Sequence, residues 1–299
     1  MRSFAVRAGF AVALSLAIAA GTAHAARLEI QGRATLFLPD VVSTPYSEIR
    51  AAVSPDGASV LWGSTDRPGG PGGWDIWIAR RTPRGWTAPS PVAFDTPAKE
   101  FDPAFSPDGR TVYFFSNRPG GFGGDDIWAV SFDPATAAFG TPENLGDAVN
   151  SRGDEWAPTA TPDGRGLLFA SDGRGGQGRH DLFVSALRGG AWQTAQPLPG
   201  EVNSAADDFD AAFVAGGAAL VFARSDDVEN APIALWAAVR DGDRYVHPQR
   251  LDARINVDGG WILGPSLDPA HSDTLLFSGH RPNSQRGKAD IHAIRFRLR

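Results

Sequence analysis

Residues 100–116 read EFDPAFSPDGRTVYFFS, an apolar stretch, a Ser-Pro-Asp-Gly turn and a second apolar stretch. Versions of this pattern occur five times along the chain. The proline position of the turn recurs every 52 to 55 residues, at Pro55, Pro107, Pro162, Ala215 and Pro269. An Asp-Ile-Trp-like segment follows each turn and begins at Asp75, Asp126, Asp181, Ala234 or Asp290. A period of a few tens of residues is typical of solenoids and β-propellers.

Each repeat predicts four short strands. Ser106, Pro107, Asp108 and Gly109 suit the successive positions of a type I turn. Apolar runs beside the turn, such as residues 167–169, fit strands that are packed between neighbouring sheets. A glycine-rich loop leads to a third strand, and a fourth begins near Trp86, Phe139, Trp192 or Tyr245. Four strands make one propeller blade, so the sequence predicts an all-β, five-bladed propeller with antiparallel blades.

The two ends of the chain indicate how the ring closes. The fifth repeat ends after its third strand, whereas residues 36–43 resemble residues 144–151, the end of the second repeat. We therefore predict that an N-terminal strand within residues 28–43 completes the last blade and covers its open edge. A six-bladed ring, the alternative, requires a sixth repeat that we do not find. The predicted blades cover residues 47–95, 96–150, 151–203, 204–256 and 257–299.

The first 25 residues have the features of a secretory signal peptide. Arg2 and Arg7 precede an apolar run over residues 10–20, and Ala23-His24-Ala25 forms a small-x-small cleavage site. We expect cleavage between Ala25 and Ala26, a periplasmic or secreted location, and a single propeller domain over residues 26–299. The chain contains no cysteine, so no disulfide bond stabilises it.

Composition excludes some partners. The 34 acidic residues outnumber the 28 basic ones, which argues against a nucleic-acid partner because phosphate binding needs clustered Lys and Arg. No segment after the leader is long and apolar enough to span a bilayer. Catalytic motifs such as G-x-S-x-G and H-E-x-x-H are missing from the sequence. His180, His280 and His292 are scattered, and we interpret them as surface or loop residues.

Two motifs carry a resemblance to a known family. The Pro-x-Phe-Ser-Pro-Asp-Gly segment at residues 103–109 and the Asp-Ile-Trp segment at residues 126–128 resemble the WD-like repeat of periplasmic TolB and its relatives. The resemblance covers about residues 28–299 and implies a propeller that acts as a binding protein of the bacterial envelope. The chain departs from that family in having five longer repeats instead of six, with no separate N-terminal TolB domain visible.

Acidic residues open most of the innermost strands. The first set is Glu48, Glu100, Glu155 and Asp208, with Ile262 at the fifth position. Two residues later stand Arg50, Asp102, Ala157, Asp210 and Gly264. Residues two apart in a strand share a face, and inner strands surround the channel. We therefore predict that both sets gather at one channel mouth and form a ligand-binding site.

Three interpretations of this acidic mouth remain open. Carboxylates held close together raise one another's pKa or attract a cation, and Ca²⁺ is the cation that prefers oxygen ligands. The amide oxygens of Asn150, Asn203 and Asn256, which lie five or six residues upstream, are further candidate ligands for Ca²⁺. The alternatives are a hydrated acidic funnel without a ligand and a site that captures a basic peptide or a sugar.

Other repeated residues have a structural interpretation. Asp75, Asp126, Asp181 and Asp290 recur in four blades, so we expect them to fix loops rather than to catalyse a reaction. Trp74, Trp156 and Trp261 lie outside the repeat register and are available for binding. Together these features favour a non-catalytic module that binds an envelope protein or polysaccharide. The alternative is a hydrolase, either a glycosidase or a metal-dependent lactonase, that uses the channel carboxylates.

Overall fold

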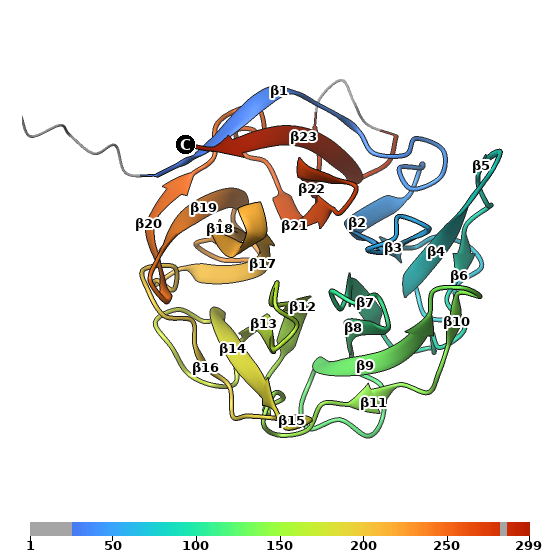
Figure 1. Cartoon of the computed structure of the whole chain (residues 1–299), viewed down its shortest axis with the longest axis horizontal. Coiled ribbons are helices and arrows are strands. Elements are labelled where there is room, and N and C mark those ends of the chain that lie inside the picture. The colour runs from blue at the N-terminus through green and yellow to red at the C-terminus, as the bar shows by residue number, and fades with distance from the viewer. Residues whose placement is uncertain (1–25, 282–285) are drawn as a thin grey trace, which may run out of the picture.

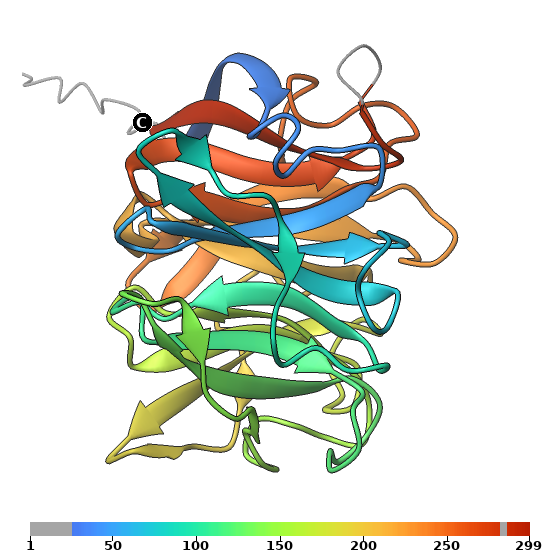
Figure 2. The same cartoon turned by 90° about the vertical axis from the view of Figure 1, so that its right-hand side faces the viewer.

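The computed structural model describes residues 26–281 and 286–299, so the predicted signal peptide lies outside the described residues. Five antiparallel sheets stand around a central channel like the blades of a propeller (Figure 1). The same ring seen from the side is shown in Figure 2. The predicted five-bladed, all-β fold is confirmed. Within the described residues, no helix is long and apolar enough to cross a membrane.

Each blade runs from an inner strand at the channel to an outer strand at the rim. Blade 1 consists of β2 (Ser47–Val53), β3 (Ser59–Thr65), β4 (Trp74–Thr82), β5 (Gly85–Trp86) and β6 (Ser90–Pro91). Blade 2 consists of β7 (Glu100–Phe105), β8 (Thr111–Ser116), β9 (Asp126–Asp133), β10 (Ala138–Phe139) and β11 (Glu143–Asn144). Blade 3 consists of β12 (Glu155–Ala160), β13 (Gly166–Ser171), β14 (Asp181–Arg188), β15 (Ala191–Trp192) and β16 (Gln196–Pro197).

The last two blades have undivided outer strands. Blade 4 consists of β17 (Asp207–Val214), β18 (Ala219–Ser225), β19 (Ala234–Asp241) and β20 (Arg244–Arg250). Blade 5 consists of β21 (Ile262–Asp268), β22 (His271–Gly279), β23 (Asp290–Leu298) and β1 (Leu28–Leu36). In blades 1 to 3 the predicted fourth strand is instead divided into two short pieces that both pair with the third strand.

The N-terminal strand closes the ring. β1 pairs antiparallel with β23, and Ile30 lies opposite Phe296 in the buried core. Just beyond β1, the amide of Phe37 donates to the carbonyl of Ile291 at 2.8 Å. The equivalent bond recurs in the other blades, for example from Leu145 to Ile127. Residues 28–43 therefore complete blade 5 with the same contacts that finish the other blades.

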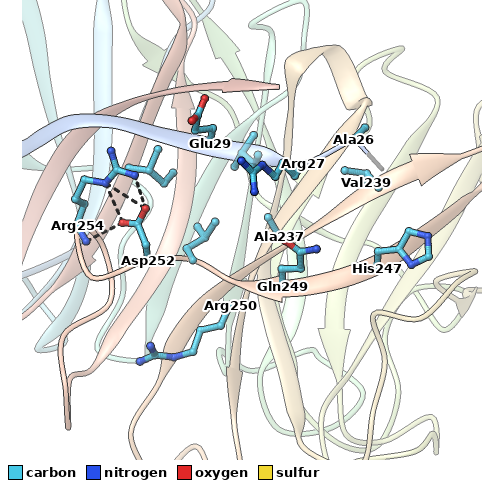
Figure 3. Close-up of a pocket in the computed structure, with 13 residues that line it drawn as sticks. Ala26, Arg27, Glu29, Ala237, Val239, His247, Gln249, Arg250, Asp252 and Arg254 are labelled. Carbon is cyan, nitrogen blue, oxygen red and sulfur yellow. Dashed lines mark hydrogen bonds and ion pairs between the residues drawn. The ribbon is translucent and has the colours of Figure 1, made fainter. Parts of the chain in front are cut away.

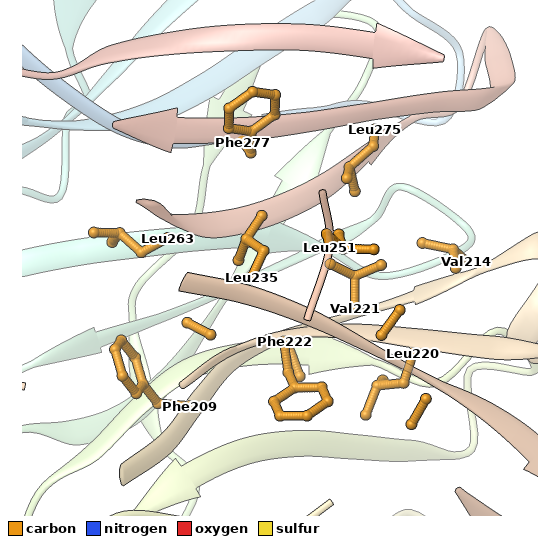
Figure 4. Packing of buried hydrophobic residues seen from close by; sticks show 14 of the residues in the cluster. Phe209, Val214, Leu220, Val221, Phe222, Leu235, Leu251, Leu263, Leu275 and Phe277 are labelled. Carbon is orange, nitrogen blue, oxygen red and sulfur yellow. The ribbon is translucent and has the colours of Figure 1, made fainter. Parts of the chain in front are cut away.

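Apolar side chains fill the space between neighbouring blades. Their strands are buried on both faces, which explains runs such as Leu220, Val221 and Phe222, each fully buried. Figure 4 shows Val221 of blade 4 pointing toward Leu275 of blade 5, whereas its neighbours Leu220 and Phe222 point to the opposite face of the sheet. In the turns, the hydroxyl of Ser106 donates to Asp108 and accepts from the amide of Thr111, as the Ser-Pro-Asp-Gly pattern requires. In the divergent fourth repeat, a 3₁₀ turn, η1 (Ala215–Gly217), replaces that pattern.

The histidine interpretation was wrong for His292, which is buried within β23, whereas His180 lies on a loop as expected, although it is also buried. His292 stacks on Phe277 inside blade 5, and its Nδ1 lies 3.1 Å from the carbonyl oxygen of Asp290. Burial, with a smaller contribution from the positive charge of Arg281, lowers the pKa of His292 to about 4.

We expect His292 to stay neutral in the folded protein down to about pH 4. The unfolded chain takes up this proton near pH 6.5, so the free energy of unfolding should fall as the pH drops from about 6.5 to about 4. NMR titration of the histidine ring signals checks this prediction. A His292 signal that titrates near pH 6.5 would contradict it.

Candidate functional site

Every inner strand contains a β-bulge at the same position. The ladder register shifts between Ile49 and Ala52 in blade 1, and at equivalent places in the other four blades. The bulged residue adopts a positive φ of 45° to 60° in each blade: Arg50, Asp102, Ala157, Asp210 and Gly264. Only Gly264 avoids the strain that this conformation imposes on other residues. The bulge also means that residues two apart no longer share a face.

The first set of acids consequently does not lie with the second. Glu48, Glu100 and Glu155 are fully buried beside the loops that join the blades. Glu100 accepts hydrogen bonds from the amide and hydroxyl of Thr96 at 2.7 and 2.8 Å and pairs with Arg118 at 3.0 Å. Glu48 contacts Thr44, Glu155 contacts Ser151 and Asp208 contacts Ser204 in the same way. Burial raises the pKa of Glu48 to about 7.

The side chain of each of the three asparagines forms two hydrogen bonds with the backbone of the third strand of a blade, an arrangement that we call the clamp. The side chain of Asn150 accepts from the amide of Ile127 at 2.7 Å and donates to the carbonyl of the same residue at 3.0 Å. Asn203 and Asn256 bind Leu182 and Leu235 in the same two-way fashion. In blade 1 the equivalent position is Asp95, which accepts from the amide of Ile76 at 3.1 Å.

The repeated aspartates hold the glycine-rich loops. Asp75 accepts hydrogen bonds from the amides of Gly72 and Gly73 at 2.8 and 2.9 Å. Asp126, Asp181 and Asp290 accept equivalent bonds from Phe122, Gln177 and Arg286. A Cβ atom on Gly121 would lie 1.9 Å from the Asp126 carboxylate, so this loop position requires glycine.

Arg50 crosses the channel from blade 1 to blade 3. Its guanidinium donates to the carbonyl of Pro158 at 3.1 Å and to the hydroxyl of Thr159 at 2.6 Å. The side chain is almost completely buried. Arg50 therefore bridges two blades across the channel and lines the cavity at one mouth, whereas Asp102 and Asp210 line the cavity at the other.

Asp102 and Asp210 lie on one side of this arginine, at the base of a mouth. They are 5% and 3% exposed. Asp210 accepts a hydrogen bond from the amide of Gly264 at 2.9 Å, whereas Oδ1 of Asp102 has no hydrogen-bond partner. Burial and then the negative charge of Asp210 raise the pKa of Asp102 well above its usual range. Burial also raises the pKa of Asp210, against the positive charge of Arg50.

Aromatic side chains surround this mouth. The cavity above the two carboxylates has a volume of about 160 Å³ and a largely apolar wall that includes Trp74, Trp156, Trp261, Phe101 and Phe209. Trp74 and Trp261 are among the few exposed large apolar side chains of the described residues, at 42% and 43% exposure. The three tryptophans that lie outside the repeat register thus meet around one cavity. We call this cavity, with Asp102 and Asp210 at its base, the aromatic mouth.

A polar network supports the wall of the aromatic mouth. Asp125 accepts from the indole N–H of Trp156 at 3.0 Å and pairs with Lys99 at 3.2 Å. The ring of His180 stacks on Trp156 at 4.2 Å, and its Nδ1 lies 3.3 Å from the Asp207 carboxylate. Sequence reasoning missed Lys99, Asp125 and His180, because they sit on loops whose place in the ring only the fold reveals.

Two further cavities lie elsewhere. The opposite mouth has a volume of about 390 Å³ and is lined by the turns that join each inner strand to the second strand of its blade, including Pro55, Pro107, Pro162 and Pro269. A groove of about 280 Å³ runs along the rim between β1 and β20, where Arg27, His247, Gln249 and Arg250 are found (Figure 3). Among the described residues, no group of three or more His, Asp or Glu is arranged to hold a metal ion. The Ca²⁺ site stays a prediction.

The comparisons with known proteins agree with the fold. TolB from Acinetobacter baumannii aligns with 85% of this chain at a TM-score of 0.52 and 15% identity, and this chain covers 56% of its length. A Bacillus subtilis arabinanase aligns with 85% of this chain and 95% of its own, at a TM-score of 0.54 and 11% identity. An α-L-arabinofuranosidase from Lactobacillus brevis aligns with 84% of this chain and 91% of its own, at a TM-score of 0.54 and 10% identity. No family model and no curated protein matches the sequence. At these identities the likeness shows the propeller fold alone.

Proposed function

We propose that the protein is an exported propeller that binds a saccharide segment of an envelope polymer in the aromatic mouth. The observation that carries this proposal is the meeting of Trp74, Trp156 and Trp261 around a concave cavity with two carboxylates at its base. Aromatic faces pack against the C–H faces of sugar rings, and a few convergent polar groups orient the ligand. The cavity is small and concave, which suits the end or a short segment of a polymer better than a flat protein surface. The leader-like residues 1–25 support export.

Titration with oligosaccharides from envelope polymers tests this function. We expect saturable quenching of tryptophan fluorescence, because three of the nine tryptophans line the site. A panel of such oligosaccharides that produces no saturable change would reject the saccharide. If a variant with a mutated aromatic mouth still binds an envelope protein saturably, a protein partner would be favoured instead.

Removing either exposed tryptophan should weaken the binding. We expect Trp74→Ala and Trp261→Ala each to lower the affinity for the oligosaccharide about tenfold, which corresponds to a loss of about 1.4 kcal/mol of binding free energy. Their exposure, 42% and 43%, means that the melting temperature should change little. Phe122→Ala is the matched control, since Phe122 is 51% exposed but lies outside the cavity. Equal affinity in all three variants would place the ligand elsewhere.

Hydrolysis of a glycosidic bond is a second candidate function. Asp102 and Asp210 face the same cavity, and burial together with the negative charge of Asp210 raises the pKa of Asp102. A protonated acid beside a second carboxylate is the pair that glycoside hydrolysis requires. Release of reducing ends from envelope polysaccharides, abolished in Asp102→Asn and Asp210→Asn, would support hydrolysis. Binding without product release would support the non-catalytic module.

A further inference from the structure

The base of the aromatic mouth has more negative than positive groups facing the ligand. Asp102 and Asp210 line the cavity, and Oδ1 of Asp102 lacks a hydrogen-bond partner. Arg50, the nearest cation, donates its side-chain hydrogen bonds to Ala157, Pro158 and Thr159 on blade 3 rather than to these carboxylates.

The other cation of the site is already engaged. Lys99 pairs with Asp125 at 3.2 Å and lies 5.5 Å from the ring centre of Trp74. The carboxyl groups of Asp102 and Asp210 can therefore accept hydrogen bonds from a donor group of the ligand. A hydroxyl would donate one hydrogen bond there, whereas an ammonium group donates three and carries the opposite charge.

The walls favour the same chemistry. Phe101 and Phe209 line the cavity beside the carboxylates, and Trp74 lies 4.8 Å from Phe101 between ring centres. Aromatic faces attract a cation that is held over them, most strongly when water is excluded. A positive group attached to a sugar ring would therefore meet carboxylates below it and aromatic faces at its sides.

Building on the saccharide-binding function, we propose that the aromatic mouth selects saccharides that carry a free amine, with Asp102 and Asp210 sharing the ammonium group. A glucosamine-type residue has this chemistry, and its acetylated and hydroxyl counterparts do not. Burial and the negative charge of Asp210 raise the pKa of Asp102, which favours a proton on this carboxyl group in the unliganded protein. A bound ammonium favours the charged carboxylate instead, so binding should release protons to the buffer.

Isothermal titration calorimetry with three matched trisaccharides tests the proposal. The ligands are the trimers of glucosamine, N-acetylglucosamine and glucose, measured at pH 6 so that the amine is charged, in two buffers of different ionisation enthalpy. We expect the glucosamine trimer to bind at least tenfold more tightly than the other two and to release protons. Asp102→Asn should remove this preference and the proton release. Asp163→Asn, the same substitution at an exposed turn of the opposite mouth, should alter neither.

Each outcome decides one of the two claims. Equal binding of all three trimers, or an unchanged preference in Asp102→Asn, would overturn the amine selectivity and leave saccharide binding intact. If neither the trimers nor any oligosaccharide of the wider panel binds, both the proposed saccharide binding and the proposed amine selectivity are rejected. Thermal melting of Asp102→Asn separates a lost contact from a lost fold.

Discussion

Deletion of residues 26–37 is expected to abolish cooperative folding. β1 supplies the whole outer strand of blade 5, and without it the nine-residue strand β23 becomes an open edge. The loss includes the buried side chain of Ile30 and the hydrogen bond from Phe37 to Ile291. A cost near the whole stability of a typical domain, about 5–15 kcal/mol, is expected. Circular dichroism and urea unfolding provide the measurement.

A milder variant keeps this prediction testable if the truncated chain aggregates. Ile30→Ala should lower the free energy of unfolding by about 2–4 kcal/mol, because it empties a buried site between β1 and the core of blade 5. Arg33→Ala, an exposed change in the same strand, should cost less than about 0.5 kcal/mol. A truncated chain with the urea midpoint of the full chain would show that β1 does not hold the ring closed.

Asp95→Asn is expected to stabilise the protein by about 2 kcal/mol at pH 7. Burial, together with the charges of Glu100 and Asp75, raises the pKa of Asp95 to about 9. Oδ1 of Asp95 is buried without a hydrogen-bond partner. An asparagine supplies the amide donor that Asn150 uses in blade 2, and it does so without holding a proton.

The pH dependence identifies the cause of this stabilisation. Between about pH 4 and pH 9 the folded protein holds a proton on Asp95 that the unfolded chain releases, so wild-type stability falls as the pH rises through this range. The advantage of Asp95→Asn should therefore be small at pH 4 and largest near pH 9. Chemical unfolding at several pH values measures it.

The reverse change is the matched control. Asn150→Asp places a carboxyl group in the clamp of blade 2 and should destabilise the protein, with the loss growing as the pH rises. If Asp95→Asn has the wild-type stability at every pH, the carboxyl group of Asp95 is not held in its protonated form.

The repeat determined how much of the fold could be predicted from the sequence. Turn residues such as Pro107 and Asp108 act locally, so their spacing alone indicated five blades and four strands in each. Closure was predictable for the same reason, because residues 36–43 carry the end of a repeat without its beginning. The division of the fourth strand into two pieces in blades 1 to 3 was not predictable, because it depends on the path that the chain takes from one blade to the next.

The site was predictable only in part. Trp74, Trp156 and Trp261 were identified because they depart from the repeat, and the structure brings them together. The two sets of acids were placed on one face because a strand alternates. The bulge at Arg50 and its equivalents breaks that alternation, and a single extra residue leaves no mark on the repeat length.

The aromatic mouth is the central claim of this account, and ¹⁹F NMR of protein labelled with 5-fluorotryptophan tests it most directly. The nine tryptophan signals are assigned with single Trp→Phe variants and followed during titration with the tightest oligosaccharide of the envelope panel. The signals of Trp74, Trp156 and Trp261 should shift together to saturation, while those of the interior residues Trp62, Trp77 and Trp128 stay in place. Saturable shifts confined to other tryptophans, with these three unmoved, would contradict the account.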